Sequence, residues 1–117
     1  MKRQKQTYND GTLNIYAVGN ISAEGDMPKE GLTLKVENLR YEERIVGMNR
    51  YWNAFQSQVK VERLLRVQLI KEVSSQDVVV PVDGEQYRIL QVQYPKDVAP
   101  PSMDLSLERI DAAYDFA

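Results

Sequence analysis

The sequence contains no cysteine and no histidine, and each absence excludes a class of functional site. Without cysteine, the chain cannot form a disulfide framework, present a thiolate nucleophile or build a cysteine-based zinc site. Without histidine, it lacks the commonest general base and the commonest metal ligand. Two large families of enzymes are therefore excluded before any pattern in the sequence is considered.

The chain also lacks long apolar runs and an excess of charge of one sign. No run approaches the ~18 residues that a membrane-spanning helix needs, and the polar N-terminus has no signal-peptide core. The 15 basic and 17 acidic residues nearly balance. We therefore expect no membrane partner, no global attraction to nucleic acid, and function in the compartment where the chain is made.

The composition is that of an ordinary globular protein. The 117 residues are 43% hydrophobic and 27% charged, which suits one hydrophobic core and predicts a single domain over residues 1–117. Residues 1–9 lack apolar periodicity and are expected to form a flexible basic arm. Residues 112–117 are expected to form a loose acidic tail.

Alternating apolar residues predict a mainly β domain. Residues 39–46 either continue the strand that precedes them after a bend or form a separate strand. The slip in alternation within residues 85–94 indicates a bulge or burial on both faces. Asp83 and Gly84 predict a type I′ hairpin turn. The predicted strands are residues 12–18, 32–36, 59–69, 78–82, 85–94 and 103–108.

One segment has helical periodicity. Large apolar residues recur at spacings of three and four over residues 48–58, which predicts a short α-helix. Its aromatic face could line a ligand groove, but closure of one end of the sheet accounts for the same residues and is the favoured interpretation. The fold class is thus a small antiparallel β-barrel or curled sheet of five to seven strands with one short helix. Arg63 interrupts the buried face of its strand and needs a partner or a bulge.

Residues 19–31 combine glycine, asparagine, serine, aspartate and proline, which predicts a long loop. Loops of this length inside a compact domain are uncommon and are usually functional or disordered. We therefore treat this loop as a candidate functional segment.

No set of residues carries the pattern of a catalytic, cofactor-binding or metal site. Glu42 and Glu43 are adjacent on a predicted strand, so they point to opposite faces. Asp83, Asp97 and Asp104 lack the spacing of a calcium loop, and the serines have no histidine to activate them. We predict no catalytic residue, no metal and no cofactor.

A mild basic patch supports a second function class. From residue 40 to residue 72 there are seven Lys or Arg and four Glu, a local net charge of +3. Tyr41, Tyr51 and Trp52 could stack on bases, although the last two lie on the apolar face of the predicted helix. A small β-barrel module that binds nucleic acid is therefore the alternative.

An ordered set of blocks within residues 10–110 resembles the head-tail joining, or head closure, proteins of long-tailed phages and prophages. The most specific piece is the hairpin Gly84-x-x-Tyr87-x-Ile89, which follows a charged strand. The blocks are residues 39–47, 48–58, 59–66, 75–77, 83–94 and 100–109.

The resemblance implies a structural protein of the virion neck and not an enzyme. Members of that family form a homo-oligomeric ring, or connector, that joins head to tail and helps retain packaged DNA. The implied partners are further copies of the chain, a portal or adaptor ring, a tail-completion protein and, transiently, the packaged DNA. The implied location is the virion neck, reached from the host cytoplasm during assembly. Within this class, a tail-completion protein of the same neck is the alternative.

Two sets of residues are candidates for assembly contacts. In the family's manner, the 19–31 loop would project toward the ring axis and contribute to channel closure. The ends carry opposite charges that suit head-to-tail contacts between neighbouring subunits. The loop candidates are Asn20, Ile21, Glu24, Asp26, Met27 and Lys29, and the end candidates are Lys2, Arg3, Lys5, Asp111 and Asp115.

Deletion of residues 20–30 is expected to leave the fold intact while heads lose their DNA or fail to join tails. The measurement is the yield of infectious particles. Normal particles from this deletion would contradict the assignment of the loop.

Overall fold

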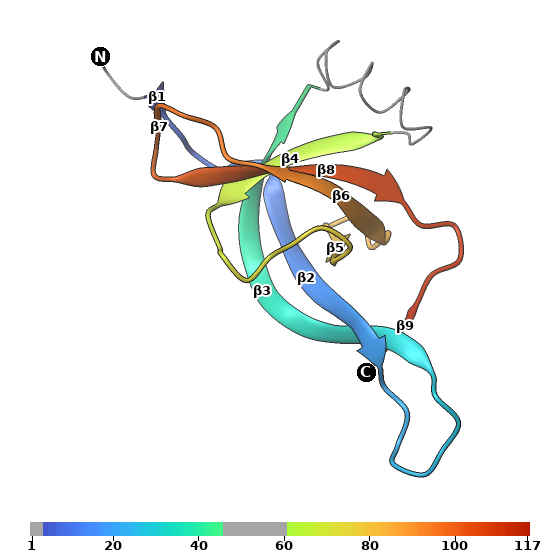
Figure 1. The fold of residues 1–117 in the computed structure, drawn as a ribbon. Coiled ribbons are helices and arrows are strands. Elements are labelled where there is room, and N and C mark those ends of the chain that lie inside the picture. Colours follow the sequence, from blue (N-terminus) through green and yellow to red (C-terminus); the bar gives the residue numbers. More distant parts are fainter. Residues whose placement is uncertain (1–3, 46–60) are drawn as a thin grey trace.

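The computed structural model describes residues 4–45 and 61–117, and these residues form strands, turns and loops (Figure 1). The helix predicted over 48–58 lies outside the described residues, as do Lys2 and Arg3. The described part contains no helix long and apolar enough to cross a membrane. The strands are β1 (Gln4–Lys5), β2 (Gly11–Asn20), β3 (Glu30–Arg44), β4 (Arg63–Gln68), β5 (Val78–Val80), β6 (Tyr87–Gln93), β7 (Val98–Ala99), β8 (Ser102–Arg109) and β9 (Asp115–Phe116).

Seven of these strands form one curled sheet, which confirms the mainly β fold. Their order is β2-β5-β6-β8-β4-β3-β9, and β2 also pairs with β3. The pairing of β2 with β3 closes a circuit of six strands, all antiparallel to their neighbours. The sheet therefore wraps around a single core (Figure 1).

The core is built by the alternating apolar residues of the central strands. On β8, Met103, Leu105 and Leu107 are fully buried, as the alternation predicts. Asp104 and Ser106, on the other face of β8, are buried as well, so this strand is covered on both sides. The other core residues include Leu13, Ile15, Tyr41, Leu65, Val67, Val79 and Ile89.

Strand β3 is continuous but bent, so residues 39–44 continue the preceding strand. Asn38 has a φ of 56°, and its N–H donates to Asn14 Oδ1 at 2.9 Å. The pairing of β2 with β3 shifts register between Leu13 and Ile15 and again between Ile15 and Tyr16. Because bulges bend a strand and increase its twist, the far half of the β2–β3 hairpin leaves the curled body as a two-stranded projection. We call this projection, residues 16–34, the arm.

Two sequence predictions about turns need correction. The expected 19–31 loop is shorter, because pairing continues to Asn20 and Glu30 and leaves only residues 21–29 between the strands. The turn at Asp83 and Gly84 is not type I′. Of these two residues only Gly84 has a positive φ, of 78°. Its N–H donates to the Pro81 carbonyl at 3.0 Å, so the turn spans residues 81–84 and Gly84 is its last residue. The bulge predicted in residues 85–94 is confirmed by a register shift between Ile89 and Gln91.

The described parts of both chain ends each include a two-residue strand, at positions where the sequence predicted a flexible arm over residues 1–9 and a loose tail over residues 112–117. Strand β1 pairs in parallel with β7, and β9 pairs in parallel with β3 at Gly31 and Leu32. These pairings use backbone groups, which side-chain periodicity does not report.

The backbone of Asn38 generates a testable prediction. Asn38→Val should lower the free energy of unfolding by about 1–2 kcal/mol, because a β-branched residue is strained at positive φ. Asn38→Gly should change it by less than about 0.5 kcal/mol, because glycine adopts this conformation freely. Urea denaturation measures both. An equal loss in the two variants would show that the asparagine side chain, and not the backbone conformation, is what matters.

Candidate assembly surface

The arm projects from the curled body. Strand β5 pairs with β2 only over residues 14–16. Residues 17–20 therefore extend about 13 Å past the body at the usual rise per residue, with the loop beyond them. Figure 1 shows the arm leaving the curled body, and the molecule measures 58 × 31 × 23 Å.

The loop at the end of the arm is closed at its base by the side chain of Asn20. Its Oδ1 accepts hydrogen bonds from the Ser22 N–H at 3.0 Å and the Lys29 N–H at 3.2 Å. The Ile21 N–H donates to the Lys29 carbonyl at 2.8 Å. Asparagine commonly stabilises turns in this way. Of the predicted loop residues, Asn20, Ile21 and Lys29 therefore organise the loop.

The remaining predicted loop residues form its exposed end. Glu24 and Asp26 are exposed, and Met27 is 87% exposed. Methionine is flexible and polarizable, so it adapts to irregular partner surfaces. The end of the arm thus presents a large apolar side chain beside two acidic ones.

The C-terminal residues brace the base of the arm. We call residues 114–117 the strap. Gln86 Nε2 donates to the Tyr114 carbonyl at 2.9 Å, and the Tyr114 N–H donates to Gln86 Oε1 at 2.8 Å. The Ala117 N–H donates to the Leu32 carbonyl at 2.8 Å. The strap therefore ties the arm to the body through its backbone.

Side chains add to the same contact. The rings of Tyr16 and Phe116 meet edge to face, with centroids 5.0 Å apart. Lys29 Nζ lies 2.7 Å from Asp115 Oδ2. This hydrogen bond and the charge of Lys29 lower the pKa of Asp115. A lowered folded-state pKa means that the contact is present above the ordinary aspartate pKa and is lost as the pH falls through the lowered value.

Lys35, the residue that directly follows the arm on β3, makes a second link to the body, which the sequence analysis missed. Its Nζ lies 2.8 Å from Asp77 Oδ2, and Asp77 is buried. The same carboxylate accepts the Ser74 N–H at 3.0 Å. Lys35 lies at the second register shift of β3. In the sequence it occupies a polar position of an alternating strand, and this pattern does not indicate a partner 42 residues away.

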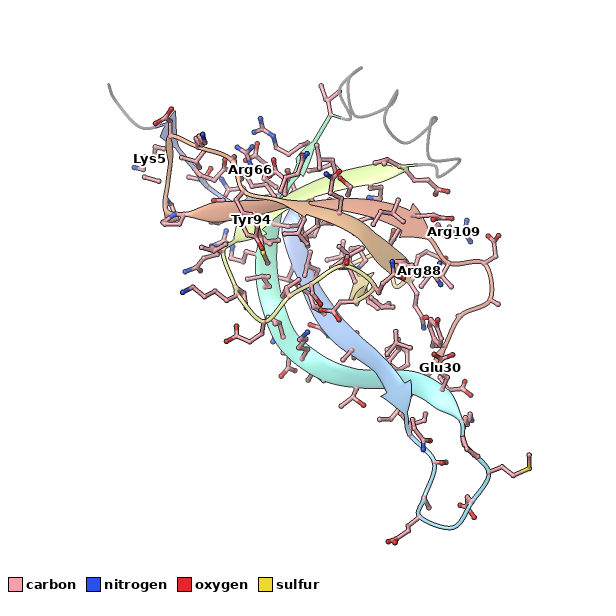
Figure 2. The ribbon with its side chains drawn as sticks, viewed as in Figure 1. Lys5, Glu30, Arg66, Arg88, Tyr94 and Arg109 are labelled. Atoms are coloured by element: carbon pink, nitrogen blue, oxygen red, sulfur yellow. The ribbon has the colours of Figure 1, made fainter. Side chains whose placement is uncertain are left out.

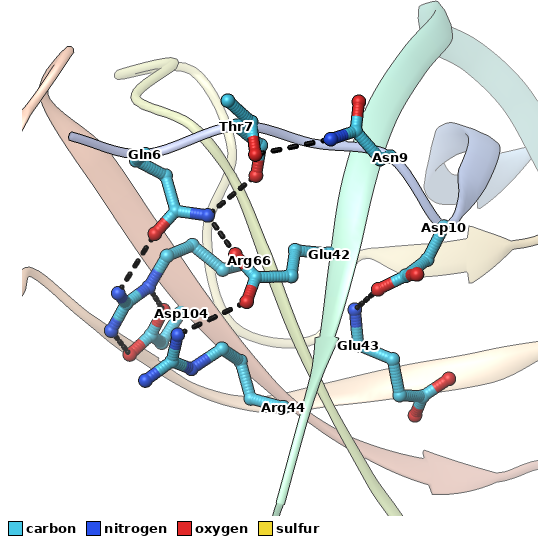
Figure 3. A network of polar contacts seen from close by, with 9 residues as sticks. All are labelled: Gln6, Thr7, Asn9, Asp10, Glu42, Glu43, Arg44, Arg66 and Asp104. Carbon is cyan, nitrogen blue, oxygen red and sulfur yellow. Dashed lines mark hydrogen bonds and ion pairs between the residues drawn. The ribbon is translucent and has the colours of Figure 1, made fainter.

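A buried polar network holds the N-terminal segment (Figure 3). Arg66 donates to both carboxylate oxygens of Asp104, at 2.7 and 3.0 Å, and to Gln6 Oε1 at 3.1 Å. Gln6 Nε2 also contacts Glu42, which pairs with Arg44 at 3.2 Å. The hydrogen bonds to Asp104 raise the pKa of Arg66, so the guanidinium stays charged.

Arg63 has the partners that its position required. Its guanidinium pairs with Glu43 and, at 3.1 Å, with Asp83. It also lies 5.2 Å from the centre of the Tyr87 ring. Glu42 and Glu43 thus join separate networks, consistent with opposite faces of β3. Both networks contain ion pairs, and within residues 4–45 and 61–117 no three acidic side chains gather where they could hold a metal ion.

The predicted end residues do not form one patch. Lys5 in β1 and Glu30 at the base of the loop lie far apart in Figure 2. Asp111 is exposed after β8, whereas Asp115 pairs with Lys29 of the same chain. The described ends therefore present basic and acidic groups at different ends of the molecule.

No family model matches the chain, and it has no significant match among curated proteins. The resemblance to head-tail joining proteins therefore depends on the sequence blocks alone.

The network around Arg66 generates a prediction about stability. Asp104→Ala should lower the free energy of unfolding by about 3–5 kcal/mol, because it leaves a buried guanidinium without its counter-charge. Glu42→Ala, at a partly exposed pair, should cost no more than about 1 kcal/mol. Urea denaturation of the two variants tests the difference. Equal losses would contradict the central place of the Arg66–Asp104 pair.

Proposed function

We propose that this chain is a structural subunit of the neck of a long-tailed phage or prophage particle. In this proposal, copies form a ring between the portal or adaptor and the tail, join head to tail and help retain packaged DNA. The supporting observation is the arm, a two-stranded projection with an organised loop that leaves a closed, single-core body. Such a subunit works through surfaces and needs no reactive side chain.

The edges of the arm favour assembly with neighbours. Within the described residues, positions 17–20 of β2 and 33–34 of β3 are paired with a strand on one side only. Exposed strand edges promote unwanted association unless a partner covers them. Neighbouring subunits of a ring, or the portal, adaptor and tail-completion proteins, would provide that cover in the virion.

The acidic charge at the end of the arm suits a channel that blocks the exit of DNA without binding it tightly. Glu24 and Asp26 are exposed, while Lys29 is paired with Asp115. Acidic groups repel DNA phosphates, so arms that converge on a channel would block it sterically with only transient contact. Subunits would fold in the host cytoplasm and take up this arrangement at the neck.

A loop replacement tests the proposal more sharply than deletion of residues 20–30. That deletion would also remove Asn20, Ile21 and Lys29, which organise the base of the loop. Replacing residues 22–28 with Asn-Gly keeps these contacts and removes only the exposed end. Electron microscopy should then show a ring on cognate portal-containing heads, while nuclease digestion should show that these heads lose their DNA.

The control is Lys96→Ala, an exposed position outside the arm, which should leave both ring formation and DNA retention unchanged. Failure of the unmodified protein to add a ring to cognate heads would overturn the proposal. Salt-dependent binding to free DNA without any ring would instead favour the nucleic-acid-binding module.

A further inference from the structure

The site that holds the strap forms hydrogen bonds with backbone groups of an extended segment. The Gln86 amide pairs with both the N–H and the carbonyl of Tyr114, as a neighbouring strand would. Strand β3 then continues the pairing at Gly31 and Leu32. These contacts need an extended segment of the right sequence, but they do not need that segment to belong to the same chain.

Three features of the site select this particular segment. Tyr16 receives the ring of Phe116, and Lys29 pairs with Asp115. Gly31 has no side chain, and a Cβ there would lie 2.8 Å from the Asp115 carbonyl oxygen. The missing side chain at Gly31 thus lets the backbone of the strap approach closely.

The strap is attached to its own body by a short exposed connection. Residues 111–113 are exposed, and so is most of the strap, with Phe116 at 52% exposure. Ahead of the connection, the Ile110 N–H donates to the Gln86 carbonyl at 2.9 Å. The strap can therefore leave its site without opening the core, because weakly buried segments open locally at low free-energy cost.

We propose that this site accepts the strap of a second copy, so that residues 114–117 are exchanged between neighbouring chains. The contacts are the same within one chain and between two, so the exchange sacrifices none of them. A neighbour held alongside raises the effective concentration of its strap. The exchanged strap then braces the arm of the next subunit. The proposal depends on the proposed function only for the ring in which the chains become neighbours.

Because the chain has no cysteine of its own, a pair of introduced cysteines can report the exchange in the full chain. Thr33 and Ala117 are the next positions in register after Leu32 and Phe116, and both are exposed. Neighbouring strands lie close enough for a disulfide between such positions. Purified Thr33→Cys and Ala117→Cys chains are mixed under mild oxidation, at concentrations up to about 1 mM, the scale of effective concentration for a short tether.

The expected result is a mixed disulfide dimer with the Thr33–Ala117 linkage, identified by mass spectrometry. Its yield should fall roughly five- to tenfold with Phe116→Ala in the chain that donates the strap, the usual loss for one aromatic pair. Glu37→Cys, an exposed position on the same strand, replaces Thr33→Cys as the matched control and should give only background linkage.

The double variant Thr33→Cys/Ala117→Cys shows whether the strap forms the disulfide within one chain. If it does so while the mixed single variants give no more than the Glu37→Cys background, the exchange is overturned. Failure of the proposed neck function is a separate outcome, because this experiment uses purified chain and no heads. Rings on heads without the mixed linkage would overturn the exchange alone.

Discussion

Strand β3 is the element on which the rest of the structure depends, because it pairs with different neighbours along its length. Its C-terminal part joins β4 and completes the curled body. Its N-terminal part pairs with β2 in the arm and with β9 at the strap. One strand can serve both places only if it changes direction, and the left-handed backbone of Asn38 and the two register shifts provide that change.

The two chain ends are held in a common way that differs from the rest of the fold. Each forms a two-residue parallel strand, β1 against β7 and β9 against β3. Such short pairings bury little apolar surface, so they belong to the least stable part of a domain. At the N-terminal end, Gln6 is drawn into the buried Arg66 network. The contacts of the strap are partly exposed and include no such buried ion pair. The strap is therefore better suited to exchange between chains than the N-terminal segment.

Side-chain alternation predicted the central strands well, because these strands bury one face and the pattern is local. The same reasoning identified Arg63 as a residue that needed partners, and Glu43 and Asp83 supply them. It did not predict the extent of the loop or the two-residue strands β1 and β9. Continued pairing to Asn20 and Glu30, and both terminal strands, depend on backbone hydrogen bonds, which leave no periodic signal in the side chains.

The sequence by itself determined the mainly β class, the absence of thiol and imidazole chemistry, and the segments that form most of the sheet. Only the tertiary structure decided that the candidate loop sits on an arm and that the strap braces its base. It also decided that Lys35 and Gln6 tie distant segments together. The physical reason is that β-pairings and ion pairs join residues far apart in the chain, whereas composition and periodicity report only local preference.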